Sequence, residues 1–359
     1  MNGRIPSYTA APYKLLDTFP QCNRQTQKKH FFSFRHGLEK NGTWEYDTKM
    51  ERNKTIYLAQ PHGMCAGVRR ALEAVDAVLE RFGPPVYVLH EIVHNSFIVN
   101  ALRERGVRFA ETLEEVPTGA VLLFSAHGVS DAVEREARAR RLSLVDATCP
   151  LVKRLHHAAE NASGVLLLLG HRGHPEVEGT VGRSGARWTF TVGGTDEIAG
   201  LPDFPADTPV ALLAQTTLNT EDVRILEDAL KKKYPQLESA AAVCYATTNR
   251  QRAVRMLAER TGVVLVIGSP HSSNSNRLRE VAEQSGAKAF LIDGAAGLPR
   301  EVLKTAASVG VGAGASAPES LVCEVIAELR NLGFGRVETV PAAEEETVFR
   351  QPIIPEKRQ

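Results

Sequence analysis

The sequence lacks the features that would place the protein in a membrane, outside the cell or on a nucleic acid. Its longest purely aliphatic runs, Val165–Leu169 and Val263–Ile267, are far too short to span a bilayer, and no signal-peptide hydrophobic region is present. The net charge is only +1, so no overall electric field favours nucleic acid or an anionic membrane surface. We therefore expect a globular protein with neither a nucleic-acid nor a membrane partner.

Cysteine is scarce, and its spacing argues against the commonest uses of the residue. The five cysteines are odd in number and widely separated, unlike those of a secreted disulfide scaffold, so we expect a reducing, cytoplasmic location. The sequence has no CxxC pair of the kind that structural zinc favours. It also has neither a phosphate-loop motif nor a strand-linked GxGxxG motif for nucleotides. We interpret Cys22 as incidental and Cys323 as part of the packing of a predicted helix.

Residues 1–54 differ in composition from the rest of the chain. They contain ten Lys and Arg against five Asp and Glu, and they show no apolar period. We expect a disordered basic extension, or upstream sequence ahead of a natural start at Met50.

From residue 55 onward, strand-like and helix-like segments alternate. This alternation predicts βαβ units with parallel sheets, and therefore an α/β fold. Ligands of such sheets bind at the carboxyl ends of the strands, which is where functional side chains are sought. The predicted strands cover residues 55–59, 86–89, 107–110, 120–125, 143–146, 165–169, 209–214, 263–268, 289–292 and 308–311.

Polar residues at the predicted strand ends follow a threefold pattern of position. Each unit opens with a cysteine just before a helix, and two further polar strand-end loops follow. The three sets are Cys65 with His94 and His127, Cys149 with His174 and Thr216, and Cys244 with Ser272 and Ser316. The cysteines lie 84 and 95 residues apart. This spacing predicts pseudo-threefold-related units of residues 55–148, 149–243 and 244–333, followed by a C-terminal tail of residues 334–359.

Three cysteines that converge from three units suit a metal centre. Cys65 precedes a predicted helix N-terminus, where unpaired N–H groups and the helix dipole favour a thiolate. Catalytic zinc with three thiolates and a [4Fe–4S] cluster are both compatible with the pattern, and in the cluster the fourth iron would have an open position for a substrate. A buried cysteine in a tight turn is the structural alternative for Cys65.

Hydroxyl and imidazole groups at other strand ends predict an anion site. Ser272, Ser273 and Asn274 begin one predicted helix, where hydroxyls and free N–H groups bind phosphate, and Ser316 precedes another. Histidines at the neighbouring strand ends could donate hydrogen bonds to the same anion. The scarcity of Lys and Arg in these loops favours a compact diphosphate in a closed cavity. Ser and Asn at such positions are also ordinary helix caps.

One carboxyl group is placed to move a proton. Glu176 stands two residues after His174 in the stretch HPEVEG, where it could deliver a proton to a leaving hydroxyl. Glu178 could take that role instead. Thr216 could hydrogen-bond the same hydroxyl, or cap the helix that begins near Thr220. An exposed carboxylate favoured by the helix dipole is the structural alternative for either glutamate.

Nine blocks of sequence, taken in order, resemble the signatures of one family. This is the LytB/IspH family of 4-hydroxy-3-methylbut-2-enyl diphosphate reductases, which perform the last step of the methylerythritol phosphate route of isoprenoid biosynthesis. The resemblance runs from Ile56 to Gly333 and does not cover residues 1–54. The blocks are PHGMCAGV, HEIVHN, FSAHGVS, DATCPLV, GHPEVEGT, QTTL, CYATTNRQ, SSNSNRL and GASAP.

The resemblance implies a fold, a cofactor and a reaction. It implies three α/β units around one central [4Fe–4S] cluster, with Cys65, Cys149 and Cys244 as its ligands. The implied reaction is a two-electron reductive dehydroxylation of (E)-4-hydroxy-3-methylbut-2-enyl diphosphate to isopentenyl and dimethylallyl diphosphate. In it the substrate hydroxyl binds the open iron, is protonated and leaves as water. The implied electron donor is ferredoxin or flavodoxin.

The resemblance also implies roles for residues around the substrate. Glu176 and Thr216 would contact the hydroxyl, with Glu176 as the proton source. The diphosphate would be held by His94, His127, His174, Ser272, Ser273, Asn274 and Ser316.

Four positions depart from the family pattern. His62 and Met64 stand where members often carry Arg and an aromatic residue, and Pro270 and His271 replace a more commonly polar pair. We expect these to affect local packing and redox tuning rather than the reaction.

Two other functions fit the same residues. One is a non-redox hydro-lyase whose open iron acts as a Lewis acid. The other is a cluster-bearing sensor of a phosphorylated metabolite, which would need an output module.

Overall fold

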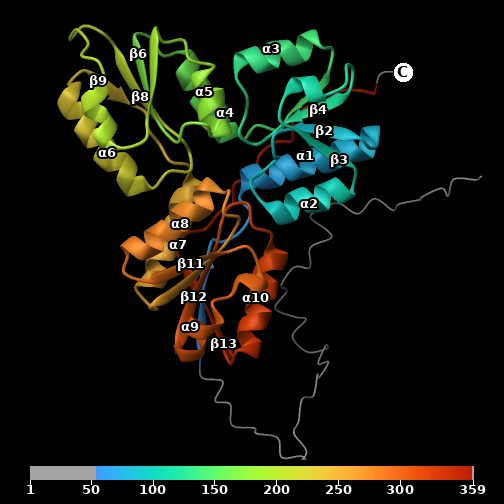
Figure 1. Ribbon diagram of the computed structural model, residues 1–359, viewed down its shortest axis with the longest axis vertical. Helices are drawn as coiled ribbons and strands as arrows, with labels where there is room; N and C mark the ends of the chain where they lie inside the picture. Colours follow the sequence, from blue (N-terminus) through green and yellow to red (C-terminus); the bar gives the residue numbers. More distant parts are fainter. Residues whose placement is uncertain (1–53, 358–359) are drawn as a thin grey trace, which may run out of the picture.

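The computed structural model describes residues 54–357 (Figure 1). Cys22 and nearly all of the predicted basic extension lie outside these described residues. The rest of the chain forms the α/β fold that the alternation predicts, with helices between strands and every paired strand parallel to its neighbour.

The strands form three separate parallel sheets, and each sheet defines one unit. The first has the order β3-β2-β4-β5, the second β7-β6-β8-β9 and the third β11-β10-β12-β1-β13. The strands are β1 (Thr55–Gln60), β2 (Val86–Leu89), β3 (Val107–Ala110), β4 (Val121–Phe124), β5 (Ser143–Asp146), β6 (Val165–Leu169), β7 (Trp188–Val192), β8 (Val210–Ala214), β9 (Leu237–Ser239), β10 (Val263–Ile267), β11 (Lys288–Ile292), β12 (Ser308–Ala313) and β13 (Arg336–Pro341). The units appear in Figure 1 as three lobes that meet at the centre of the molecule.

Helices with one apolar face cover these sheets. In α1, residues Val68, Ala71 and Val75 recur at helical spacing and are buried in the core of the first unit. The helices are α1 (Ala66–Phe82), α2 (Ser96–Glu104), α3 (Asp131–Ala139), α4 (Pro150–Glu160), α5 (Pro175–Val181), α6 (Thr220–Lys233), α7 (Tyr245–Ala258), α8 (Ser273–Gln284), α9 (Arg300–Thr305) and α10 (Glu319–Asn331), with short 3₁₀ turns η2 (Leu113–Glu115), η3 (Thr195–Gly200) and η4 (Ala295–Gly297). None of the helices within residues 54–357 is long and apolar enough to cross a membrane.

The sheets group the ends of the chain differently from the expected units. We expected the first strand to belong to the unit of residues 55–148, but β1 lies between β12 and β13 of the third sheet. The expected tail of residues 334–359 begins with β13, which is a full strand of that sheet. The strands β7 and β9, at the two edges of the second sheet, are likewise additional to the predicted ones.

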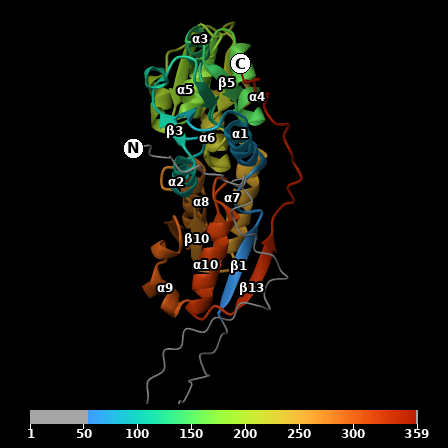
Figure 2. The same ribbon diagram turned by 90° about the vertical axis from the view of Figure 1, so that its right-hand side faces the viewer.

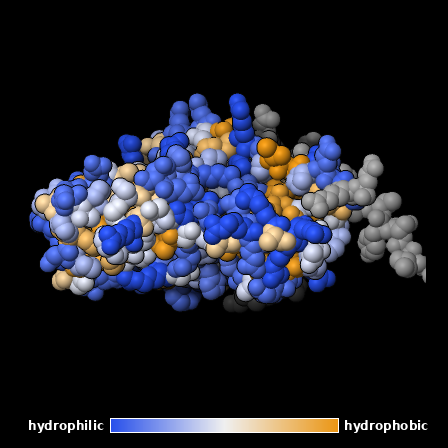
Figure 3. Space-filling view, turned by 90° about the horizontal axis from the view of Figure 1, so that it is seen from above, coloured by the Kyte–Doolittle hydropathy of each residue, from blue (hydrophilic) through white to orange (hydrophobic). Residues whose placement is uncertain are grey.

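An extended C-terminal segment connects two of the units. The chain after β13 leaves the third unit and runs as an extended segment toward the first (Figure 2). The surface seen from above is mostly hydrophilic, with small apolar areas between the charged side chains (Figure 3).

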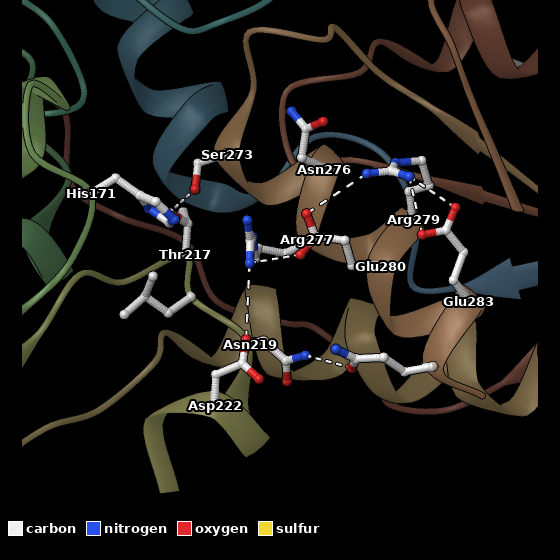
Figure 4. Close-up of polar contacts among 12 residues, drawn as sticks. His171, Thr217, Asn219, Asp222, Ser273, Asn276, Arg277, Arg279, Glu280 and Glu283 are labelled. Atoms are coloured by element: carbon white, nitrogen blue, oxygen red, sulfur yellow. Dashed lines mark hydrogen bonds and ion pairs between the residues drawn. The ribbon is translucent and has the colours of Figure 1, made fainter. Parts of the chain in front are cut away.

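The second and third units also meet along a polar seam (Figure 4). Thr217, in the loop after β8, donates a hydrogen bond to Ser273 of α8 at 3.1 Å. Farther along, the Asn219 amide donates to Gln284 at 3.0 Å. The seam therefore links the loop after β8 to both ends of α8, at Ser273 and at Gln284.

Candidate active site

Each of the three cysteines is the N-cap residue of a helix at the centre of the molecule. Cys65 precedes α1, Cys149 precedes α4 and Cys244 precedes α7. All three are half-buried and form no disulfide. Their backbone carbonyls accept the first helical hydrogen bonds, so each thiol stands beside unpaired helix N–H groups and the positive end of a helix dipole.

Backbone hydrogen bonds hold each cysteine against another predicted site loop. The N–H of Cys65 donates to the Ala315 carbonyl at 3.1 Å, and that of Cys149 donates to Ala126 at 3.0 Å. These acceptors directly precede Ser316 and His127 in the sequence. The N–H of Cys244 donates to Thr216 at 3.0 Å. The cysteine loops and the polar strand-end loops are therefore built as one unit.

The cysteine side chains face one another across a small space. A Cβ atom on Gly67 would lie 2.7 Å from the Cys149 sulfur and 3.8 Å from the Cys65 sulfur, so only glycine leaves room for these thiols. Burial, with a smaller contribution from the charge of the neighbouring cysteines, raises the pKa of Cys149 to about 12 and that of Cys244 to about 11. The thiols of Cys149 and Cys244 therefore keep their protons at neutral pH unless a positively charged group displaces those protons.

Three histidines form a compact group beside the cysteines. The rings of His94 and His127 are stacked, with centroids 4.4 Å apart, and the His174 ring meets both edge-on at 5.6 and 5.5 Å. Burial, together with the neighbouring imidazoles, holds the pKa of His127 well below its ordinary value. Burial likewise lowers the pKa of His174 to about 4. These two rings are neutral at pH 7 in the protein alone.

Glu176 is buried in the same region and is held by Thr216. Its carboxylate accepts the Thr216 N–H at 2.6 Å and the Thr216 hydroxyl at 2.9 Å. Burial raises the pKa of Glu176 to about 7, although the two Thr216 hydrogen bonds oppose the rise. The alternative carboxyl, Glu178, is exposed and accepts the Gly173 N–H at 3.1 Å. The structure therefore turns Glu176 inward and Glu178 outward.

The N-terminus of α8 supplies hydroxyl and amide groups. Ser272 caps the helix, because its hydroxyl accepts the Ser275 N–H at 3.3 Å, so the ordinary capping function is also present. The Asn274 side chain is 4 % exposed, yet neither of its polar atoms has a hydrogen-bond partner within residues 54–357. A buried amide without partners is costly, which indicates that a ligand completes its hydrogen bonding. Ser316 donates to the His94 carbonyl at 3.2 Å.

All of these side chains line a single cavity between the three units. The predicted residues in its wall are Cys65, His94, His127, Cys149, His174, Glu176, Thr216, Cys244, Ser272, Ser273, Asn274 and Ser316. The structure thus brings together every site residue that the strand-end pattern and the family resemblance indicated.

Sequence reasoning missed several other residues of the wall. Thr217 directly follows Thr216, and Tyr245 directly follows Cys244. Their position next to predicted site residues was the signal in the sequence that could have identified them. Phe349 comes from the segment after β13, and no pattern in the sequence marks it. The four positions that depart from the family pattern, among them His62 and Met64, lie outside the wall of this cavity.

The fold and this cavity together define the class to which the protein belongs. It is a three-unit α/β protein with a ligand site between its units, lined by three convergent cysteines and a group of histidines. The chain matches the family model described as LytB protein over residues 56–330. It therefore belongs to the LytB family, as the sequence blocks indicated.

Curated relatives match nearly their whole length. The chain is 49% identical over 302 residues to 4-hydroxy-3-methylbut-2-enyl diphosphate reductase 2 of Bradyrhizobium diazoefficiens, covering 83% of this chain and 97% of the relative. It is 48% identical over 306 residues to the 4-hydroxy-3-methylbut-2-enyl diphosphate reductase of a Psychrobacter species, covering 83% of this chain and 96% of the relative.

Solved structures also match. The E-1-hydroxy-2-methyl-but-2-enyl-4-diphosphate reductase of Plasmodium falciparum superposes with a TM-score of 0.78 at 32% identity, covering 85% of this chain and 95% of that one. A second structure, an (E)-4-hydroxy-3-methyl-but-2-enyl diphosphate reductase described as the terminal enzyme of the non-mevalonate pathway, superposes with a TM-score of 0.56 at 29% identity. It covers 77% of this chain and 99% of that one.

Proposed function

We propose that this protein is a 4-hydroxy-3-methylbut-2-enyl diphosphate reductase, the last enzyme of the methylerythritol phosphate route. It takes two electrons and two protons to convert (E)-4-hydroxy-3-methylbut-2-enyl diphosphate into isopentenyl or dimethylallyl diphosphate and water. The observation that carries the proposal is the meeting of three cysteines, three histidines and the Glu176–Thr216 pair in one cavity. Family membership and the names of the relatives support it.

A [4Fe–4S] cluster, one per chain, would be held by Cys65, Cys149 and Cys244. Their thiols open on one cavity, and the raised pKa values of Cys149 and Cys244 suit ligands whose protons a cationic group displaces. Within residues 54–357, no three His, Cys, Asp or Glu side chains are grouped closely enough to hold a single metal ion. When bound, the cluster would pass electrons from an external donor to the substrate and offer an iron with an open coordination position.

The diphosphate would lie among the histidines and the N-terminus of α8. Burial keeps His127 and His174 neutral without a ligand, and an anion beside them would favour their protonated, doubly donating form. The unpartnered Asn274 amide and the hydroxyls of Ser272, Ser273 and Ser316 would contribute further hydrogen bonds. These groups bind and orient the substrate by its diphosphate end.

The Glu176–Thr216 pair would act at the other end of the substrate. A carboxyl with a pKa of about 7 holds a proton near neutral pH and can release it to a departing hydroxyl. Thr216 fixes the carboxyl orientation through both of its hydrogen bonds. The C–O bond breaks and the oxygen leaves as water with the proton from Glu176. A second proton then adds to a carbon of the allylic fragment that remains.

Electron delivery and location complete the proposal. The donor would be a one-electron carrier such as ferredoxin or flavodoxin, and the protein would act in the cytoplasm. The hydro-lyase and sensor alternatives gain no support, because the named relatives are reductases.

The test is the iron and acid-labile sulfide content after anaerobic purification, with visible spectra before and after adding the substrate. We expect about four irons per chain, a substrate-induced spectral change, and turnover only when a reductant is supplied. Bound zinc, or a cluster whose visible spectrum does not change when the substrate is added, would overturn the proposal. Turnover without a reductant would favour the hydro-lyase.

A further inference from the structure

The segment that follows β13 crosses from the third unit to the first, and we name residues 342–355 the strap (Figure 2). It starts where the Ala342 N–H donates to the Gln60 carbonyl at 2.7 Å. It ends where Ile354 packs against the core of the first unit and Arg81 of α1 donates to the Ile354 carbonyl at 2.8 Å. The strap lies beyond the family match, which ends at residue 330.

A buried arginine ties the strap to two of the cysteine loops. Arg250 of α7 is 2 % exposed and forms an ion pair with Glu345 of the strap at 3.0 Å. The same guanidinium donates twice to the Gly63 carbonyl, at 3.0 and 2.8 Å, and once to Ala246 at 2.8 Å. Gly63 lies just before Cys65, and Ala246 just after Cys244. A fully paired buried charge of this kind holds its neighbours in one arrangement.

A second buried arginine ties the strap to the remaining cysteine loop. Arg70 of α1 is 6 % exposed and donates to the strap carbonyl of Arg350 at 2.7 Å. It also donates to the Thr148 carbonyl, directly before Cys149, at 2.9 Å. All three cysteine loops are therefore linked to the strap through one arginine or the other.

Between these two anchors, the strap places an aromatic ring in the wall of the site. Phe349 lines the central cavity together with Tyr245. Both residues also line a second cavity of about 800 Å³ on the outer side, whose wall includes Met64 and Arg69. The two rings therefore stand at the boundary between the outer cavity and the cysteine-lined centre. Val348, the preceding strap residue, lines the outer cavity alone and is 90 % exposed.

We propose that the Phe349 ring, held in place by the strap, forms a wall between the outer cavity and the cysteine-lined centre. This wall keeps dioxygen and bulk water in the outer cavity from reaching the centre. A bare backbone or a small side chain at this position would join the two cavities. The proposal rests on the proposed function only in that a cluster is what the wall protects. The ring acts through exclusion and takes no part in the chemistry.

The first test compares single variants of the full-length holoenzyme prepared without oxygen. On exposure to air, we expect Phe349→Ala to lose its cluster absorbance several-fold faster than the unmodified protein. Phe349→Leu, which restores apolar bulk, should return the decay close to the unmodified rate. Val348→Ala is the matched control on the same strap and should also decay at that rate. Equal decay in Phe349→Ala and the unmodified protein, or equally fast decay in Val348→Ala, would overturn the proposal.

The second test works whether or not a cluster is present. Iodoacetamide labelling of the full-length protein is followed by mass spectrometry at Cys65, Cys149 and Cys244, with Cys323 on α10 as the internal reference. We expect faster labelling of the three central thiols in Phe349→Ala and in Glu345→Gln, which removes the charge that anchors the strap. Absence of iron together with faster labelling would refute the cluster but uphold the wall. Unchanged labelling in both variants would refute the wall.

Discussion

At the scale of single residues, the site depends on groups whose ordinary protonation is altered by burial. Glu176 is 2 % exposed, and it keeps a proton to about pH 7 because its charged form is poorly solvated there. The same burial leaves His127 and His174 neutral. Near neutral pH, the site therefore combines a carboxylic acid that can give up a proton with imidazoles that can take one up. This combination suits an anionic substrate from which a hydroxyl group is removed.

Replacing Glu176 by Gln should separate binding from turnover. The amide can still accept the Thr216 N–H and donate to its hydroxyl, so cluster content and substrate affinity should stay near normal. Turnover should fall by about a hundredfold or more, because the proton donor is lost. Steady-state kinetics with a chemical reductant, together with iron analysis, checks both points. Thr217→Ser, in the cavity wall beside Thr216, is a conservative control. Undiminished turnover would assign the proton to another group.

The raised pKa of Glu176 also predicts how the stability of the folded protein depends on pH. A free glutamate has a pKa near 4.3, so below about pH 4 the carboxyl is protonated in both the folded and the unfolded chain and costs little. As the pH rises toward 7, the unfolded chain loses this proton first, and the folded state becomes less favoured. Without substrate, Glu176→Gln should therefore unfold at a higher temperature than the unmodified protein above pH 7, and at a similar temperature at pH 4. A constant difference across this range would contradict the raised pKa.

The histidine group predicts proton uptake when an anion binds. His127 and His174 are neutral alone, and a diphosphate would raise the pKa of both by its negative charge. Pyrophosphate should bind more tightly as the pH falls from 8 toward 6, with net uptake of protons from the buffer. Calorimetry in two buffers of different ionisation enthalpy measures that uptake directly. His174→Gln should reduce it, and equal heats in both buffers would contradict the prediction.

At the scale of elements, the site is built where three helices begin. Helices α1, α4 and α7 each start at a cysteine, and each cysteine N–H is bonded to a loop that bears another site residue. Close approach at the first turn of α1 depends on Gly67, where a Cβ would press on the Cys149 sulfur. The elements thus set the space among the thiols as well as their positions.

Gly67→Ala tests that space without removing a ligand. The added methyl group would lie 2.7 Å from the Cys149 sulfur, which is closer than real contacts allow, so the thiols must move apart. We expect markedly reduced iron and sulfide content in a protein that is otherwise folded. Gly262→Ala, where the same methyl group meets open space, is the control and should keep full content. Full content in Gly67→Ala would mean that the thiols are not held this closely.

The sequence allowed most of the site to be predicted, but less of the way in which the strands assemble. Cysteines and histidines at strand ends could be placed because parallel strands bring their carboxyl ends together. The position of β1 between β12 and β13 depends on contacts more than 240 residues apart, which local patterns do not record. The strap has no apolar period at all. The strap is held by the hydrogen bond from Arg70 to the Arg350 carbonyl and by the ion pair between Arg250 and Glu345. Because these contacts join residues far apart in the sequence, no local pattern identified Phe349 as a residue of the site.

At the scale of the whole molecule, the ligand site is the place where three separately built sheets meet. The three sheets have no strand in common, and each unit has its own apolar core. The first unit contributes His94 and His127 to the cavity, the second contributes His174, and the third contributes the N-terminus of α8. A ligand held by all of these groups would contact all three units at once.

Pyrophosphate should therefore stabilise the whole protein, and variants in each unit should weaken the effect. A ligand at a hundred times its dissociation constant adds about 2.7 kcal/mol of stability by mass action. Losing one hydrogen bond to a charged group removes about 1.5–3 kcal/mol of binding. We expect the ligand-induced rise in unfolding temperature, measured at one fixed pyrophosphate concentration, to shrink in His94→Asn, His174→Asn and Asn274→Ala alike. His157→Asn, at a side chain 78% exposed on α4, should keep the full rise. A loss confined to variants of one unit would mean that the anion rests on that unit and does not bridge the three.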